Sequence, residues 1–396
     1  MAPHRINLDA ASGALPLPEV KAAMAEALEQ GGNPSSIHAA GRRAKQALER
    51  ARAQVAGLLN AKTQEVFFTS CGTESNNWAL RGLLAANKRA GRHLITSAIE
   101  HPSISLVARR LELEGVVRVT TLPVDGEGLV PPRALKEALA PETALVSVML
   151  ANSEVGTIEP IRELAAIAHE HGALFHTDAV AAAGHAPIDV QALGVDALSL
   201  AANQFCGPPG AAALYVRDGV RILPLLEGGG QETGTRSGTE SLPAIVGMGV
   251  AAEAAARDLP DRSRRLAALR DRLRDGLRER LEGLRLNGSW AARLPHNLHV
   301  CVDGLASEAL VLALDAEGIA AGLGSACNSK AMRPSHVLKA MGLTDEQAAG
   351  ALVFTLGVQT TDDEIAEALE RIPPVVERLR RLTRLTARAE KGSDPL

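Results

Sequence analysis

The run Phe68-Thr-Ser-Cys-Gly-Thr-Glu-Ser-Asn-Asn77 follows a short apolar segment and opens a stretch with helical spacing that continues through Ala86. This order predicts a strand, a tight turn and then a helix. Small and hydroxyl-bearing residues in such a turn present backbone N–H groups to an anion at the helix N-terminus. Gly72 and Thr73 are therefore candidate anion-binding residues, with a plain helix cap as the alternative interpretation.

Apolar runs of strand length alternate with helical patterns on both sides of this turn. Helices are expected over 17–31 and 38–59. Strands are expected at Val66–Thr69, Leu94–Ser97, Val116–Leu122, Ala144–Leu150, Ala173–Thr177, Ala197–Ala201 and Ala211–Val216. Such alternation predicts a mainly parallel sheet covered by helices on both faces, with ligands at the carboxyl ends of its strands.

The same patterns predict the domain organisation. A large α/β domain is followed by a long helix or helix pair, broken near Pro260, and then by a smaller α+β domain. The predicted segments are 1–16 (N-terminal segment), 17–245 (large α/β domain), 246–285 (connecting helix region), 286–390 (small C-terminal α+β domain) and 391–396 (flexible tail).

Charge and composition exclude several classes of protein. The chain has 396 residues, with 42 Lys and Arg against 46 Asp and Glu and a formal net charge of −4. This balance gives no support to nucleic-acid binding, and no apolar run reaches the roughly 18 residues of a membrane span. The N-terminus lacks the apolar stretch of a signal peptide, so we expect a cytoplasmic protein. The four cysteines form no C-x-x-C pair, which argues against a zinc finger or a disulfide framework.

Two further strand ends carry residues suited to a flat cofactor. His101, in Ser97-Ala-Ile-Glu-His-Pro102, follows a strand, where an imidazole could stack on a ring. Asp178, in Phe175-His-Thr-Asp-Ala179, could hold a pyridinium nitrogen protonated. A structural histidine and a helix-capping aspartate are the alternative interpretations of these two residues.

The second half of the chain adds a glycine-rich loop and a cysteine in an unusual setting. The loop Gly228-Gly-Gly-Gln-Glu-Thr-Gly-Thr-Arg-Ser-Gly-Thr239 could supply phosphate donors. Cys327 lies in Leu323-Gly-Ser-Ala-Cys-Asn-Ser329, among small residues typical of a loop that delivers a thiolate, and Lys330 would favour that thiolate by its charge. A buried structural cysteine is the alternative, and its small polar neighbours disfavour it.

In order and spacing, these stretches resemble cysteine desulfurases of the nitrogen-fixation and iron–sulfur-assembly type. The resemblance covers essentially the whole chain, and its further motifs are Gly32-Asn-Pro-Ser-Ser-Ile-His38, the Ser199–Arg217 segment, Arg236-Ser-Gly-Thr239, Gly324-Ser-Ala-Cys327 and Pro334-Ser-His-Val-Leu338. It implies the fold type I architecture of pyridoxal-phosphate (PLP) enzymes in the class V aminotransferase group. That fold is α/β, a mainly parallel seven-stranded sheet flanked by helices, with a smaller C-terminal α+β domain. The resemblance also implies a homodimer whose glycine-rich loop enters the neighbouring subunit's pocket.

The resemblance assigns candidate roles to individual residues. Family members activate free cysteine with a PLP-bound lysine and pass its sulfur to a loop cysteine as a persulfide, leaving alanine. The implied catalytic residues are Cys327 and His101. The implied cofactor-binding positions are Gly72, Thr73, Ser153, Asp178, Asn203, Gln204, Ser237 and Thr239. The implied substrate-binding positions are Asn33, His38, Arg236 and Val353.

Several of these positions depart from the family pattern. Gln204 stands where the family's His-Lys-Phe-x-Gly-Pro-Lys-Gly stretch has the Schiff-base lysine, and a carboxamide cannot form an aldimine. The other replacements are Asn203 for His, Ala201 for Ser, Ala181 for Gln, Ser153 for Asn and Val353 for Arg. The replaced arginine clamps the substrate carboxylate, and losing such a bidentate pair removes roughly 2–4 kcal/mol of binding.

We therefore expect a divergent cysteine desulfurase-like protein that has lost lysine-dependent PLP catalysis and keeps sulfur handling through Cys327. A sulfur acceptor or scaffold protein would be its partner. One alternative is an active desulfurase with PLP held non-covalently, or with Lys330 as a substitute lysine. Another is a metal or cluster site formed by Cys71, Cys206 and Cys327, with unrelated thiols around an empty pocket as the competing interpretation. No other metal site is expected.

Overall fold

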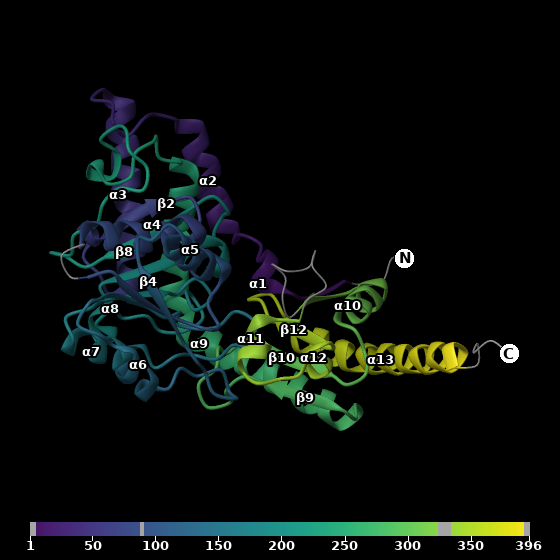
Figure 1. Ribbon diagram of the computed structural model, residues 1–396. Coiled ribbons are helices and arrows are strands. Elements are labelled where there is room, and N and C mark those ends of the chain that lie inside the picture. The colour runs from purple at the N-terminus through teal and green to yellow at the C-terminus, as the bar shows by residue number, and fades with distance from the viewer. Residues whose placement is uncertain (1–4, 88–90, 324–333, 392–396) are drawn as a thin grey trace.

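The computed structural model describes residues 5–87, 91–323 and 334–391, which build two sheets and their helices (Figure 1). The large sheet has seven strands in the order β2-β8-β7-β6-β5-β3-β4. Its strand β8 is antiparallel to both neighbours, and the other adjacent pairs are parallel, which confirms the predicted sheet. These strands are β2 (Val66–Thr69), β3 (His93–Ser97), β4 (Arg118–Leu122), β5 (Thr143–Ser147), β6 (Leu174–Asp178), β7 (Ala197–Ala201) and β8 (Ala212–Val216).

The second sheet has five strands in the order β1-β11-β12-β10-β9. The pair β1 and β11 is parallel, whereas the other pairs are antiparallel. The strands are β1 (Ile6–Leu8), β9 (Leu284–Asn287), β10 (Asn297–Val302), β11 (Ile319–Leu323) and β12 (Ala351–Thr355). The N-terminal segment thus supplies an edge strand to a sheet formed otherwise by the last third of the chain.

Helices cover both sheets. The α-helices are α1 (Ala10–Gly13), α2 (Pro18–Gln30), α3 (Ala39–Leu59), α4 (Gly72–Ala86), α5 (Pro102–Leu113), α6 (Pro132–Ala138), α7 (Ile161–Glu170), α8 (Val190–Leu193), α9 (Leu242–Arg280), α10 (Ser307–Ala316), α11 (His336–Ala340), α12 (Asp345–Ala348) and α13 (Asp362–Lys391). Short 3₁₀ turns are η1 (Thr63–Glu65), η2 (Ala202–Phe205) and η3 (Gln231–Gly234).

The large sheet is buried on both faces because its strands alternate their side chains between two apolar clusters. Leu94 and Leu145 belong to the cluster that includes residues of α4 and α5. Their neighbours Ile95 and Val146 belong to the cluster that includes residues of α3, α7 and α9. A parallel sheet that is covered by helices on both faces needs strands with apolar residues at nearly every position, and these strands have them.

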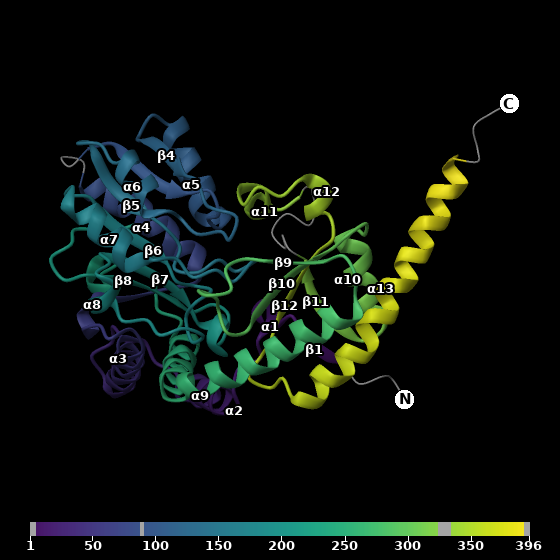
Figure 2. The same cartoon turned by 90° about the horizontal axis from the view of Figure 1, so that it is seen from below.

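The small sheet packs one face against α9, α10 and α13, whereas α11 and α12 lie on its other side (Figure 2). Leu8, Val300 and Phe354 of its strands share one apolar cluster with Leu273 of α9 and Val376 of α13. Helix α9 therefore joins the two sheets, because its first part packs against α2 and α3 beside the large sheet.

The predicted break near Pro260 is wrong. Helix α9 runs without interruption over 39 residues, with Pro260 inside it. A proline removes one backbone hydrogen bond and crowds the preceding turn, and a long helix packed at both ends tolerates that loss. The strand β1 was not predicted, because three residues are too few for a recognisable period.

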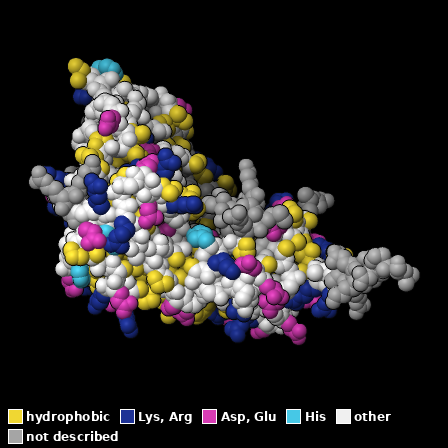
Figure 3. Space-filling model, viewed as in Figure 1, with side chains coloured by type: hydrophobic (Ala, Val, Ile, Leu, Met, Phe, Trp, Pro, Cys, Tyr) yellow, Lys and Arg dark blue, Asp and Glu magenta, His cyan; other side chains and the backbone are white. Residues whose placement is uncertain are grey.

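On the face in Figure 3, basic and acidic side chains intermingle between patches of apolar ones. Among the described residues, no helix combines the length and the apolar character that crossing a lipid bilayer requires.

Candidate functional site

A cavity of about 390 Å³ lies where the carboxyl ends of the large sheet's strands face the small sheet. Residues that follow β2, β3, β5, β6 and β7 line one side of it. Gly322, Val353 and Thr355, on β11 and β12, line the other. Crevices at strand carboxyl ends are where such sheets bind ligands, so this cavity is the candidate functional site.

The turn between β2 and α4 closes one end of the cavity with Cys71, Gly72 and Thr73. A Cβ on Gly72 would lie 2.6 Å from Val180 Cγ2, so a side chain at this position would collide with the loop after β6. Helix α4 begins at Gly72, and Cys71 at its N-cap position makes no side-chain capping bond. The predicted anion-binding turn is therefore at the cavity, with its backbone N–H groups at a helix start.

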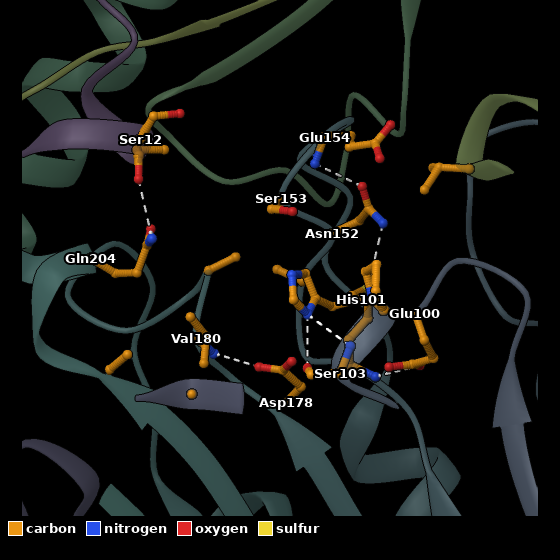
Figure 4. Close-up of a pocket in the computed structure, with 18 of the residues that line it drawn as sticks. Ser12, Glu100, His101, Ser103, Asn152, Ser153, Glu154, Asp178, Val180 and Gln204 are labelled. Atoms are coloured by element: carbon orange, nitrogen blue, oxygen red, sulfur yellow. Dashed lines mark hydrogen bonds between the residues drawn. The ribbon is translucent and has the colours of Figure 1, made fainter. Parts of the chain in front are cut away.

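Asp178 and His101 both line the cavity (Figure 4), and a chain of hydrogen bonds through Asn76 and Ser103 links them. Asp178 accepts from the Val180 backbone N–H at 2.9 Å and from Asn76 Nδ2 at 2.6 Å. Asn76 Nδ2 also lies 2.8 Å from Ser103 Oγ, and Ser103 Oγ lies 2.7 Å from His101 Nδ1. Burial raises the pKa of Asp178 above its ordinary value, and these two hydrogen bonds partly oppose that shift.

Gln204 lies on η2, directly after β7, and lines the cavity. Its Nε2 donates to the Ala11 backbone carbonyl at 3.2 Å, beside Ser12, as Figure 4 shows. Asn203, Ala201 and Ala181 line the cavity close by. The replacements noted in the sequence are thus brought together in space.

The wall on the side of the small sheet carries no arginine among its described residues. Val353 on β12, which the sequence resemblance aligns with the substrate-clamping arginine, lines the cavity and is buried. Ser153 lines it from the loop after β5. Among the described residues that line the cavity, none is lysine or arginine.

Sequence reasoning missed three carboxyl groups of the lining, those of Asp9, Glu100 and Glu154. Glu100 accepts from Ser97 Oγ at 2.6 Å and from the Met149 backbone N–H at 2.9 Å, while its Oε2 has no hydrogen-bond partner among the residues that the structure describes. Burial raises the pKa of Glu100 to about 8 and that of Glu154 to about 7. Glu100 precedes the predicted His101 in the sequence, and this neighbour was the available signal for a carboxyl group at the site. The sequence alone does not show that the Glu100 side chain is buried.

We expect Glu100 to make the protein less stable as the pH rises. Its raised pKa means that the folded chain keeps a proton that the unfolded chain releases between about pH 4.5 and pH 8. The free energy of unfolding therefore falls with pH in that window, by at most about 1.4 kcal/mol per pH unit from this group. Urea unfolding at pH 5.5 and pH 7.5 measures this effect. Between these two pH values the free energy of unfolding should fall by about 2–3 kcal/mol less in Glu100→Gln than in the wild type. Glu170→Gln, at an exposed position on α7, is the matched control, and equal slopes for all three proteins would contradict this assignment.

Five of the predicted cofactor- and substrate-binding residues lie outside the cavity. Arg236 makes an ion pair with Glu74, at 2.8 Å and 3.2 Å. The Ser237 hydroxyl donates to the Gly229 carbonyl at 2.8 Å. The other three, which also do not line the cavity, are Asn33, His38 and Thr239. Cys327, predicted as the catalytic thiol, and Lys330 lie outside the described residues.

The expectation that Cys71 and Cys206 line one pocket is wrong. Cys206 lines a neighbouring cavity of about 200 Å³ with His185 and His296, and this cavity shares Gln204 with the first. Cys206 ends η2 with a left-handed backbone, at a φ of 63°. Within the described ranges, no group of three or more His, Cys, Asp or Glu residues is arranged to hold a metal ion.

Comparison with known proteins explains this combination of fold and pocket. The model of the family described as "Aminotransferase class-V" matches residues 6–367. A protein of Methanosarcina thermophila named "Cysteine desulfurase IscS" is 46% identical over 367 residues, covering 93% of this chain and 90% of that protein. This chain belongs to the cysteine desulfurase family of the class V aminotransferases.

Solved structures agree with this membership of the cysteine desulfurase family. A structure described as "NIFS-LIKE PROTEIN" superposes with a TM-score of 0.89 at 34% identity, covering 95% of this chain and all of that one. A structure described as "SspA in complex with cysteine" has a TM-score of 0.78 at 32% identity, covering 90% of this chain and all of that one. Both values confirm the predicted fold class.

Enzymes of the cysteine desulfurase family depend on PLP, but the residues described here do not fit PLP held as a lysine aldimine. That linkage needs a primary amine, and the described cavity lining contains none. Gln204, which the sequence resemblance aligns with the lysine, donates its amide Nε2 to the Ala11 carbonyl. No reaction step through a covalently held cofactor follows from this pocket.

Proposed function

We propose that this chain is a cysteine desulfurase family protein that has lost lysine-dependent PLP catalysis and handles sulfur through Cys327. The observation that carries the proposal is Gln204 at the lysine position, in a cavity whose described lining holds neither lysine nor arginine. A free cysteine substrate would find no amine to activate it and no guanidinium for its carboxylate. The pocket has lost the groups for breaking a carbon–sulfur bond, whereas the Gly324–Cys327 motif of the sulfur-accepting side is present in the sequence.

The proposed chemistry is sulfur relay rather than desulfuration. The Cys327 thiolate attacks the outer sulfur of a low-molecular-weight or protein persulfide. A new sulfur–sulfur bond forms as the old one breaks, and the donor leaves as its thiol after taking up a proton. The product is a Cys327 persulfide, which a thiol of an acceptor protein can take over by the same exchange. No external oxidant or reductant is required, because sulfane sulfur only changes its carrier.

We expect persulfide loading to rank the four thiols. Cys301 is fully buried on β10 and burial raises the pKa of its thiol to about 11, so it should stay unmodified. Burial also raises the pKa of Cys206, whereas Cys71 is exposed, so Cys71 should load faster than Cys206. Cys327 should load fastest.

The measurement is peptide mass spectrometry after brief exposure to limiting cysteine persulfide, followed by alkylation with iodoacetamide. Cys327→Ser should abolish most of the added sulfur, and the matched variant Cys71→Ser should leave it nearly unchanged. Faster loading of Cys71 or Cys206 than of Cys327 would overturn the relay through Cys327.

A second candidate function is desulfuration with PLP held non-covalently. It is favoured by Asp178 and His101, which face the same cavity from β6 and from the start of α5, and by the anion-binding turn at Gly72. The buried Val353 opposes it, because the carboxylate of the substrate meets no cation there. L-cysteine turnover in the presence of added PLP separates the two candidates.

The proposal includes a homodimer. Arg236 and Thr239 lie outside the cavity of their own chain, which supports their delivery to the pocket of a second copy. Light scattering coupled to size exclusion should report twice the 41.4 kDa mass of one chain.

A further inference from the structure

The second residue of helix α5, Ser103, makes two hydrogen bonds to His101. His101 is the N-cap residue of α5, and its Nδ1 accepts from the Ser103 backbone N–H at 3.1 Å. A backbone N–H can only donate, so Nδ1 must offer a lone pair in this arrangement. A neutral imidazole carries its proton on one nitrogen, and that nitrogen must then be Nε2.

The hydroxyl of Ser103 reinforces the same assignment. Asn76 Nδ2 lies 2.6 Å from Asp178 Oδ2 and 2.8 Å from Ser103 Oγ, so one amide hydrogen serves each oxygen. Since Ser103 Oγ accepts from Asn76, its own hydrogen is left for His101 Nδ1, 2.7 Å away. Asn76, Ser103 and Asp178 are each at least nine-tenths buried, which protects these bonds from exchange with water.

We propose that Ser103 is a positioning residue whose two donors, the backbone N–H and the hydroxyl oriented by Asn76 and Asp178, together hold neutral His101 as the Nε2–H tautomer. In Figure 4 the Nδ1 edge of the ring faces Ser103 and the opposite edge, with Nε2, points into the cavity. In this tautomer the ring nitrogen on the cavity side, Nε2, is a hydrogen-bond donor. The matching ligand atom is an acceptor, such as a carbonyl, carboxylate or phenolate oxygen or a thiolate sulfur.

This inference does not depend on the proposed function, because the hydrogen bonds fix the proton whether or not a cofactor binds. The test is nitrogen NMR of the full-length protein labelled with ¹⁵N-histidine, at a pH where its imidazoles are neutral. Loss of one set of signals in His101→Gln identifies those of His101. In the wild type, the two-bond correlations of His101 should show the protonated nitrogen at Nε2 and the unprotonated one at Nδ1.

Two matched serine variants on α5 separate positioning from mere packing. Ser103→Ala keeps the backbone N–H, so the tautomer should persist, while the Nδ1 resonance should move downfield because it loses one of two donors. Ser105→Ala, two residues further along the same helix, should change neither signal. An Nδ1–H tautomer in the wild type would overturn the inference, as would a Ser103→Ala spectrum that matches that of Ser105→Ala. Detection of lysine-bound PLP would refute the proposed function and leave this assignment standing.

Discussion

Release of sulfide and alanine from L-cysteine by the purified protein, with PLP supplied, should match that of PLP in buffer. The missing lysine removes the group that shuttles protons in the family, a role worth about 10²- to 10⁴-fold in rate. The replacement of the clamping arginine by Val353 removes roughly 2–4 kcal/mol more, from the free energy of binding the substrate carboxylate. Together they predict a kcat/KM at least about 10³-fold below that of a lysine-containing family member assayed in parallel. Comparable turnover by the two proteins would contradict the loss of catalysis.

Reverting the pocket should restore turnover only when several positions are changed together. Gln204→Lys alone supplies the amine but leaves Ala201 and Asn203 on the phosphate side and Val353 on the substrate side. We expect less than about a tenfold gain from it, and a gain of about 10²-fold or more when Val353→Arg, Ala201→Ser and Asn203→His are added. These positions line one cavity, so their effects should be strongly non-additive.

The measurement is kcat/KM for L-cysteine, and the control carries Gln204→Arg in place of Gln204→Lys together with the same three other substitutions. Arginine restores a positive charge but offers no nucleophilic amine near neutral pH, so it should rescue nothing. Full recovery from Gln204→Lys alone would show that the other replacements are neutral and that the loss of activity rests on one residue.

The parts of the fold that sequence predicts well are those with strong local patterns. The turn at Gly72, the strand before Asp178 and the segment around Gln204 each pair an apolar strand with a polar end. Their meeting at one cavity follows from the rule for parallel sheets. The resemblance to a known family then supplied the functional meaning of the replaced residues.

The features that sequence could not supply depend on packing between distant segments. The hydrogen bonds that join Asn76, Ser103 and Asp178 link three elements separated by up to 102 residues. The raised pKa of Glu100 requires full burial, which its polar neighbours in the sequence do not indicate. Cys206 was assigned to the wrong pocket because its cavity is formed with His185 and His296, which are distant from it in the sequence.

The central claim, that no lysine of this protein holds PLP, is tested most directly by borohydride reduction followed by peptide mapping. Borohydride converts a lysine aldimine into a stable pyridoxyl-lysine, and the protein should be treated both as purified and after incubation with excess PLP. A lysine-containing relative of the family is the positive control. We predict no specifically labelled peptide from this chain, because Gln204 stands at the attachment position and the described cavity lining contains no lysine. Stoichiometric labelling of a single lysine peptide, above all one containing Lys330, would contradict the account.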